Sequence, residues 1–214
     1  MCFPNINYQV PVPILGNLQE LPSGPRGMVT LLTNRNLFHL GEMDAINNME
    51  ELEADIIQRI EVFQVGDNPL DIFHRIQIWG GLTGRSIYTR DGGFREENVT
   101  PYYNDLLNTC IGINELNQPA IHQVFNAIHD FNVNVRNIGI PFITKHTRFW
   151  LTRSLGDNAL PIYDKVMAQN LMGRRNATEA NLLLYWQRMI NKAQYEDITL
   201  VALERILFHY YQNL

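Results

Sequence analysis

Residues 132–173 read NVNVRNIGIPFITKHTRFWLTRSLGDNALPIYDKVMAQNLMG, and this stretch decides the fold. It predicts a helix, a short turn around Gly139 and Pro141, and a second helix that opens at Lys145. A proline-containing loop then leads to Asp164, nineteen positions after Lys145. We expect Asp164 to cap the next helix, because an aspartate at the N-cap accepts a hydrogen bond from the first backbone amides. The stretch therefore predicts two helices around a tight turn, followed by a capped third helix.

The rest of the chain is also predicted to be mainly helical. Apolar residues recur at helical spacing in residues 48–63, where acidic side chains crowd the first turns. Residues 82–100 are expected to form a loop or a short hairpin, and no internal repeat or strand-rich region is present. Further helices are expected from Pro69 to Gly80, from Pro101 after a Thr100 cap, from Asn117 and Pro119, and over residues 178–194 and 199–213. The predicted fold class is all-α.

The first 35 residues differ from the remainder, because five prolines and three glycines interrupt any regular period there. We expect residues 1–35 to be an irregular N-terminal arm and residues 36–214 to be a single helical domain. No apolar run approaches the roughly 18 residues that cross a bilayer. The N-terminus has no signal-peptide pattern, and Cys2 and Cys110 provide neither a disulfide framework nor a metal cluster. A cytoplasmic protein without membrane association, metal or cofactor is expected.

Charge is distributed unevenly along the chain, whose formal net charge is −5. Residues 1–70 carry three basic and nine acidic side chains, a net charge of −6. Residues 133–175 carry seven basic and two acidic side chains, a net charge of +5. A phosphate backbone responds to the local field, so the basic segment suits a nucleic acid. Basic residues that solvate a helix surface explain the same pattern equally well.

The turn at Gly139, the following Lys145 and the Pro161 loop before Asp164 resemble the helix-hairpin-helix DNA glycosylases, in particular the 8-oxoguanine-excising branch. The close resemblance covers residues 132–173, and the back half of the chain resembles the family loosely. The resemblance implies two helical lobes around a cleft, with Lys145 as the nucleophile and Asp164 as its electrostatic and proton-handling partner. It also implies DNA contacts from six residues: Arg85, Arg136, Gly139, Thr144, His146 and Arg148.

The sequence departs from the family pattern at three points. Gly139-Ile140-Pro141 keeps only the first of the two usual hairpin glycines, and Pro141 lacks an amide donor for a phosphate. The Pro-x-Asp of the family becomes Pro161-Ile162-Tyr163-Asp164, which is one residue longer. The chain has no four-cysteine iron–sulfur tail. These departures bear on the identity of the target base more than on the chemistry.

The pairing of an amine with a carboxylate suits cleavage of the bond between base and deoxyribose. That cleavage builds positive charge on the sugar, which a nearby carboxylate stabilises. A neutral amine attacks the same carbon and forms a Schiff base with the opened sugar. The pKa of Lys145 must therefore fall below the model value of roughly 10.4, through burial or through nearby cations. Arg136, His146 and Arg148 are the candidate cations in the sequence.

The predicted function is that of a monomeric DNA glycosylase and abasic-site lyase for base excision repair. It would bind double-stranded DNA and excise a damaged, oxidised purine such as 8-oxoguanine through a lysine Schiff base. An alternative of a different class stays open, namely a non-catalytic helical module of the same fold that binds nucleic acid or another protein. His122 and His129 lie seven positions apart, and no cysteine or carboxylate at ligand spacing accompanies them, so a metal site is not predicted.

Overall fold

The computed structural model describes residues 46, 48–81, 86–91 and 93–212, and every regular element in these ranges is helical. The prediction of an all-α fold is confirmed for this part of the chain. No helix within it is long and apolar enough to cross a membrane. The predicted N-terminal arm, residues 1–35, and Arg85 lie outside the described residues.

The α-helices are α2 (Met49–Val62), α3 (Leu70–Trp79), α4 (Ser86–Thr89), α5 (Glu96–Gly112), α6 (Gln118–Asn134), α7 (Ile140–Leu155), α8 (Lys165–Asn170), α9 (Leu182–Glu196) and α10 (Leu200–Gln212). Two 3₁₀ turns, η4 (Gly156–Asn158) and η5 (Glu179–Asn181), complete the regular elements of the described residues.

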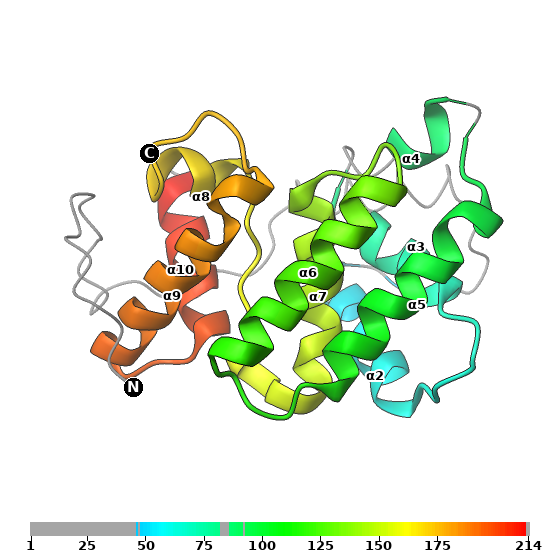
Figure 1. Cartoon of the computed structure of the whole chain (residues 1–214). Coiled ribbons are helices and arrows are strands. Elements are labelled where there is room, and N and C mark those ends of the chain that lie inside the picture. Colours follow the sequence, from blue (N-terminus) through cyan, green and yellow to red (C-terminus); the bar gives the residue numbers. More distant parts are fainter. Residues whose placement is uncertain (1–45, 47, 82–85, 92, 213–214) are drawn as a thin grey trace.

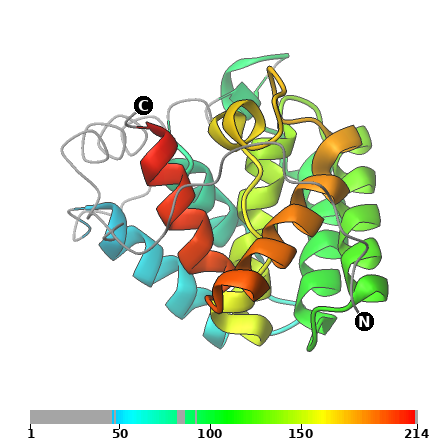
Figure 2. The same cartoon turned by 90° about the vertical axis from the view of Figure 1, so that its left-hand side faces the viewer.

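Helix α7 is the centre of the larger group of helices. It packs against α2, α3, α5 and α6, and Figures 1 and 2 show it enclosed by them. Ten of its sixteen residues are buried, including polar ones on several faces. Helices α8, α9 and α10 form a second group beside it, on the left in Figure 1. The chain passes from the first group to the second through η4 and residues 159–164. Asp164 therefore lies at the end of this connection, where α8 begins.

Side-chain caps fix the starts of several helices. Asn48 accepts a hydrogen bond from the amide of Glu51 at 2.8 Å, and Asn117 accepts one from Ala120 at 3.0 Å. Asp164 accepts one from the amide of Met167 at 3.0 Å. Each cap satisfies a backbone donor that the first turn leaves without a helical partner. The predicted cap at Asp164 is confirmed, and so is the start of a helix at Asn117.

Two helix starts were predicted wrongly, at Pro101 and at Lys145. Helix α5 begins at Glu96, so Pro101 lies inside the helix and Thr100 is not its cap. Val99, in the preceding turn, is buried in the core, and this packing stabilises the turn as helix. Helix α7 begins at Ile140, with Gly139 as its N-cap and Pro141 in its first turn. Proline is tolerated there because the first amides of a helix have no helical acceptor.

Residues 86–89 form the short helix α4 where a loop or hairpin was expected. A turn follows it at Asp91, whose φ is 49°, and Gly93, whose φ is 85°. The predicted helix from Pro69 to Gly80 corresponds to α3, which ends at Trp79. Gly81 then adopts a left-handed φ of 93°, which a glycine accommodates without strain.

Candidate functional site

A tight turn joins α6 to α7 at one edge of the molecule, the upper edge in Figure 1. Asn137 adopts a left-handed φ of 63°, and its side-chain amide donates to Asp91 at 3.0 Å. Arg136 and Gly139 are exposed in this turn. Helix α7 begins at Ile140, and the amides of Phe142 and Ile143 in its first turn donate to the Gly139 carbonyl at 2.9 and 3.1 Å. The predicted turn between two helices is present, one or two residues earlier than expected.

Lys145 lies in the second turn of α7, and not at the helix start where it was predicted. Its side chain is partly buried, and its Nζ donates to the carbonyl oxygen of Gly80 at 3.2 Å. The same nitrogen lies 4.3 Å from the centroid of the Phe142 ring, a cation–π distance. The amine is therefore held between the end of α3 and its own helix.

Gly80 has a steric role in this contact. A Cβ added at this position would lie 2.3 Å from Cε1 of Phe142, which is closer than carbon atoms approach. The absence of a side chain thus allows the Phe142 ring to cover the end of α3, where the Gly80 carbonyl meets Lys145. The sequence predicted that a helix ends at Gly80. The contact with Phe142 gives a second reason why position 80 requires a glycine.

Asp164 and Lys145 come within electrostatic range of each other although nineteen positions separate them. Burial raises the pKa of the Asp164 carboxyl, while the amide of Met167 and the charge of Lys145 act in the opposite direction. Burial also lowers the pKa of Lys145, against the opposing effects of Asp164 and Glu204. An amine that loses its proton more readily is a better nucleophile near neutral pH.

The lowered pKa of Lys145 has a different cause from the nearby cations considered in the sequence. Burial is its largest cause, and the neighbouring charges that act on it are carboxylates. Arg136 is exposed in the hairpin turn, and His146 is neutral inside the core. Desolvation of the ammonium is therefore the physical origin of the shift.

The loop before Asp164 is fixed by side chains from three other helices. Residues 161–163, here called the anchored loop, expose almost no surface. Each anchor satisfies a buried backbone group, and losing one would leave that group without a partner. The four hydrogen bonds are Trp186 Nε1 to Pro161 O at 3.0 Å, Tyr185 Oη to Ile162 O at 2.7 Å, Ile162 N to Glu204 Oε2 at 2.8 Å, and Tyr163 N to Thr144 Oγ1 at 3.1 Å.

Sequence reasoning missed three of these anchors. Tyr185 and Trp186 lie on α9 and Glu204 lies on α10, each at least 23 positions from its partner. No local pattern marks them. A signal was present only in Glu204, a carboxylate placed among the apolar residues of an amphipathic helix. Thr144 was predicted as a DNA contact, and its hydroxyl instead holds the Tyr163 amide.

His146 is completely buried and belongs to a polar network inside the larger group of helices. Its Nδ1 lies 2.9 Å from the Tyr103 hydroxyl, its Nε2 lies 2.9 Å from the Gln77 side chain, and its ring stacks on Phe73 at 4.6 Å. The Trp150 indole donates to Tyr103 at 2.8 Å. The atom of Gln77 that faces the ring is its amide nitrogen, which only donates, so Nε2 of His146 accepts and the ring carries its proton on Nδ1, next to the Tyr103 hydroxyl.

Arg148 is also buried, with an exposed fraction of 3%. Its Nη1 donates to Oε1 of Glu53 at 3.0 Å, and Arg205 reaches the same oxygen at 2.7 Å. These contacts join α7 to α2 and α10. In this conformation Thr144, His146 and Arg148 present almost no surface to a ligand, while Arg136 and Gly139 remain exposed.

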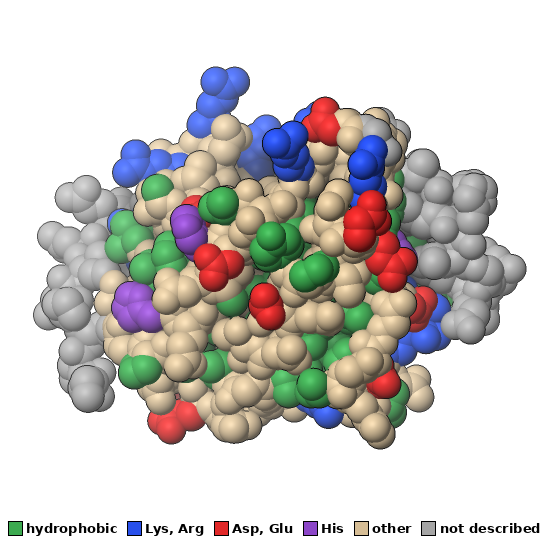
Figure 3. Space-filling view, turned by 45° about the vertical axis from the view of Figure 1, so that its right-hand side comes forward, with side chains coloured by type: hydrophobic (Ala, Val, Ile, Leu, Met, Phe, Trp, Pro, Cys, Tyr) green, Lys and Arg blue, Asp and Glu red, His purple; other side chains and the backbone are tan. Residues whose placement is uncertain are grey.

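Exposed cations gather at the edge that carries the hairpin turn. Figure 3 shows Lys and Arg side chains along the upper rim and acidic ones mainly on the face below. The exposed basic residues come from the α6–α7 turn, from α8 and the loop after it, and from the segment between α4 and α5. We call this set the basic edge: Arg90, Arg95, Arg136, Lys165, Arg174 and Arg175.

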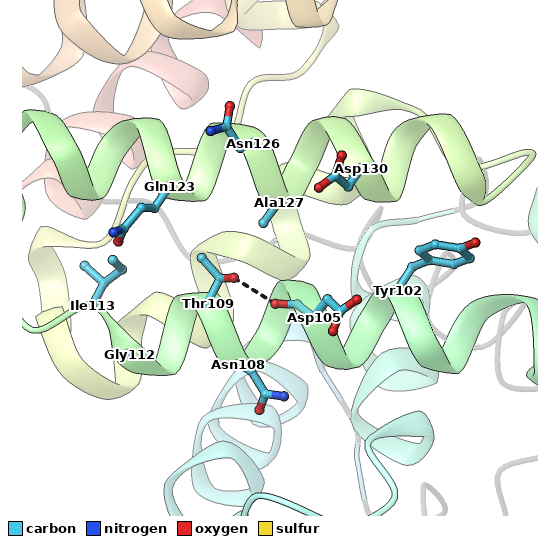
Figure 4. A pocket seen from close by; sticks show the side chains of 10 residues that line it. All are labelled: Tyr102, Asp105, Asn108, Thr109, Gly112, Ile113, Gln123, Asn126, Ala127 and Asp130. Carbon is cyan, nitrogen blue, oxygen red and sulfur yellow. Dashed lines mark hydrogen bonds between the residues drawn. The ribbon is translucent and has the colours of Figure 1, made fainter.

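An open groove of about 670 Å³ lies between α5 and α6, away from the basic edge. Figure 4 shows Asp105 and Asp130 pointing into it from the two helices. Most of its other lining residues are polar, and neither Lys145 nor Asp164 is among them. Two carboxylates disfavour a phosphate chain, so this groove is a poor site for DNA. The prediction of a cleft between two lobes stays a prediction.

The described residues contain no group of three His, Cys, Asp or Glu side chains that would hold a metal ion. His129 instead pairs with Glu179, with 2.7 Å between Nδ1 and Oε1. His122 is exposed and lines a small pocket between α6 and α9. The two histidines therefore do not converge on a common ligand.

Comparisons with known protein families, curated proteins and solved structures found no match to this chain. The chemistry of the site must therefore be argued from its own geometry. That geometry combines a partly buried amine of lowered pKa, a carboxylate fixed as a helix cap, and a neighbouring edge of exposed cations. Such a set attacks an electrophilic carbon and stabilises positive charge beside it.

We expect acid to destabilise the fold through His74. Its Nδ1 contacts the Tyr88 hydroxyl, and burial lowers its pKa from 6.5 to about 4. The unfolded chain binds a proton below pH 6.5 while the folded chain does not, so stability is lost as pH falls toward 4. The loss is about 3 kcal/mol at pH 4. Thermal unfolding of wild type and His74→Gln from pH 7.5 to 4 measures it: the gap between them should change with pH, and a constant gap would contradict the prediction.

Proposed function

We propose that this protein is a DNA glycosylase with abasic-site lyase activity that acts through Lys145. The observation that carries the proposal is that Lys145 and Asp164 lie within electrostatic range of each other, with burial lowering the pKa of the amine. The resemblance of residues 132–173 to helix-hairpin-helix glycosylases supports the same roles. Both residues are partly exposed.

In the proposed reaction the neutral amine of Lys145 attacks C1′ of the deoxyribose. The bond between C1′ and the base nitrogen breaks, and its electron pair leaves with the base, which takes up a proton. Opening of the sugar gives a Schiff base between Lys145 and C1′, and elimination of the 3′ phosphate then cuts the strand. Asp164 stabilises the positive charge on the sugar and accepts a proton from the attacking amine.

The basic edge supplies the proposed DNA-binding surface. Arg136 is exposed in the turn before α7, where a phosphate would lie close to the helix N-terminus. The net charge of −5 for the whole chain does not oppose this arrangement, because the Debye length is only about 8 Å at physiological salt. The exposed cations therefore act locally.

An oxidised purine such as 8-oxoguanine is the proposed target, on the strength of the resemblance. Excision requires the base to leave the DNA stack and to enter the protein next to Lys145. Duplexes that contain 8-oxoguanine, other modified purines or an abasic site, incubated with wild-type protein, test the proposal. Strand cleavage at the lesion is the expected result. Binding to every duplex without cleavage of any would instead favour the non-catalytic module.

We expect neutralisation of the basic edge to weaken DNA binding without altering the fold. Replacing Arg174 and Arg175 by Gln removes two exposed charges. The plot of log K for DNA binding against log salt concentration should therefore become less steep, by roughly one unit of slope per lost phosphate contact. Lys192→Gln is the matched control, because Lys192 lies on α9 and pairs with Glu196. Fluorescence anisotropy at several salt concentrations measures both. Equal slopes for the double variant and wild type would exclude this surface.

A further inference from the structure

Glu204 is the carboxylate among the side chains that hold the anchored loop. It lies in α10, and its exposed fraction is 8%. Its Oε2 accepts a hydrogen bond from the amide of Ile162 at 2.8 Å, two positions before Asp164. A buried carboxylate is costly, and the proposed reaction does not use this one directly. Its position therefore calls for a physical account.

Several charged or titratable groups lie around Glu204, and they come from each helix near it. Burial raises the pKa of Glu204 from 4.5 to about 7, while Arg148 and the Ile162 amide act in the opposite direction. The negative charge of Glu204 in turn raises the pKa of Lys145. The surrounding groups are Lys145 and Arg148 on α7, Glu53 on α2, Asp164 at the start of α8, and Tyr185 on α9.

Two effects thus meet in one side chain. Through Ile162, Glu204 fixes the backbone that ends at Asp164. Through space, its charge favours the ammonium form of Lys145. Loss of the charge alone and loss of the hydrogen bond alone should therefore have different consequences.

We propose that Glu204 is a positioning residue of the Lys145 site, whose carboxylate holds the loop before Asp164 and lies within electrostatic range of the Lys145 amine. The consequence of Glu204 for catalysis rests on the proposed function, whereas its electrostatic effect on the Lys145 amine does not. When Glu204 is ionised, the Lys145 ammonium is stabilised. When Glu204 is protonated, that stabilisation disappears and the neutral amine forms more readily.

Two variants separate the charge from the hydrogen bond. Glu204→Gln removes the charge, while its amide oxygen still accepts from the Ile162 amide. Tyr185→Phe is the matched control, because it removes the hydrogen bond to the Ile162 carbonyl and leaves every charge of the site in place. Tyr185→Phe therefore loosens the anchored loop without changing any charge, and Glu204→Gln changes the charge while it keeps the hydrogen bond to Ile162.

The direct test is the NMR titration of protein labelled with ¹³C at the lysine ε-carbons. The chain contains three lysines, Lys145, Lys165 and Lys192, so the spectrum has few signals, and Lys145→Gln assigns the relevant one. We expect the Lys145 midpoint to shift to lower pH in Glu204→Gln and to stay near the wild-type value in Tyr185→Phe. An unchanged midpoint in Glu204→Gln, or an equal shift in both variants, would overturn the proposal.

A second measurement connects this shift to catalysis. The rate of Schiff-base formation on an abasic-site duplex is measured against pH. In Glu204→Gln the rise of this rate should begin at lower pH than in wild type. Below the wild-type midpoint the rate, relative to its high-pH plateau, should be several-fold higher in the variant. If the Lys145 signal shifts but wild type forms no Schiff base, the proposed function fails while the electrostatic role of Glu204 stands. If wild type is active and the NMR midpoint shifts without any change in the pH profile, the positioning role in catalysis is wrong.

Discussion

Lys145→Gln is expected to abolish base release and strand cleavage, with a loss on the order of 10³-fold or more, because it removes the nucleophile. The fold should persist, since the glutamine amide is also able to donate to the Gly80 carbonyl that Lys145 contacts. Burying a neutral amide in place of an ammonium removes a desolvation cost as well. Single-turnover cleavage of a lesion-containing duplex measures the loss, and circular dichroism checks the fold.

Lys165→Gln is the matched control for this variant. Lys165 is exposed at the first position of α8, next to Asp164 in sequence, and contributes to the basic edge. Its loss should weaken DNA binding slightly and leave the rate of chemistry on bound DNA unchanged. If Lys145→Gln cleaved bound DNA at the wild-type rate, or if both variants lost activity equally, Lys145 would not be the nucleophile.

Asp164→Asn is expected to lower the rate of base release by about 10² to 10³-fold, because it removes the charge that stabilises the sugar cation. The variant should unfold at nearly the wild-type temperature, since asparagine caps a helix about as well as aspartate. Its side-chain oxygen accepts from the Met167 amide as Asp164 does. This variant should therefore lose most of its rate of base release while its thermal stability stays close to that of wild type.

Asp164→Ala provides the comparison that isolates the cap. Alanine accepts no hydrogen bond from Met167, so the variant should lose about 1 kcal/mol of stability in addition to its activity. Chemical denaturation of the two variants measures the difference. Equal base release by Asp164→Asn and wild type would show that the carboxylate is only a helix cap.

Much of the fold was predictable because helix signals are local. Asp164 was predicted as a cap and Asn117 as the start of a helix, and both residues cap the helices that follow them. Proline was a weaker guide. Pro101 and Pro141 were both interpreted as marking a boundary, yet each lies within a helix. A proline fits the first turn of a helix, and the sequence does not reveal where that turn begins.

The candidate site was predictable only in part. The nearness of Lys145 and Asp164 followed from a resemblance that spans 42 residues, and that spacing is short enough for one motif to contain. The side chains that hold the anchored loop come from α9 and α10. Their contacts depend on how distant helices pack, and no local pattern records that packing.

His146 illustrates the same limit. A histidine between Lys145 and Thr147 suggests a polar helix face, and the sequence predicted a contact with DNA. The structure surrounds it with Gln77, Tyr103 and Phe73 from two other helices, which satisfy both ring nitrogens in the core. A polar residue in a helix becomes internal when distant partners supply its hydrogen bonds.

Borohydride trapping on a duplex with one abasic site, followed by mass-spectrometric mapping of the adduct, tests the central claim most directly. Reduction fixes a Schiff base as a stable amine, and its position identifies the nucleophile. The proposed mechanism predicts a covalent protein–DNA product attached at Lys145 and absent from Lys145→Gln. An adduct at Lys165, at Lys192 or at the N-terminal amine, or no adduct on DNA that the protein binds, would contradict it.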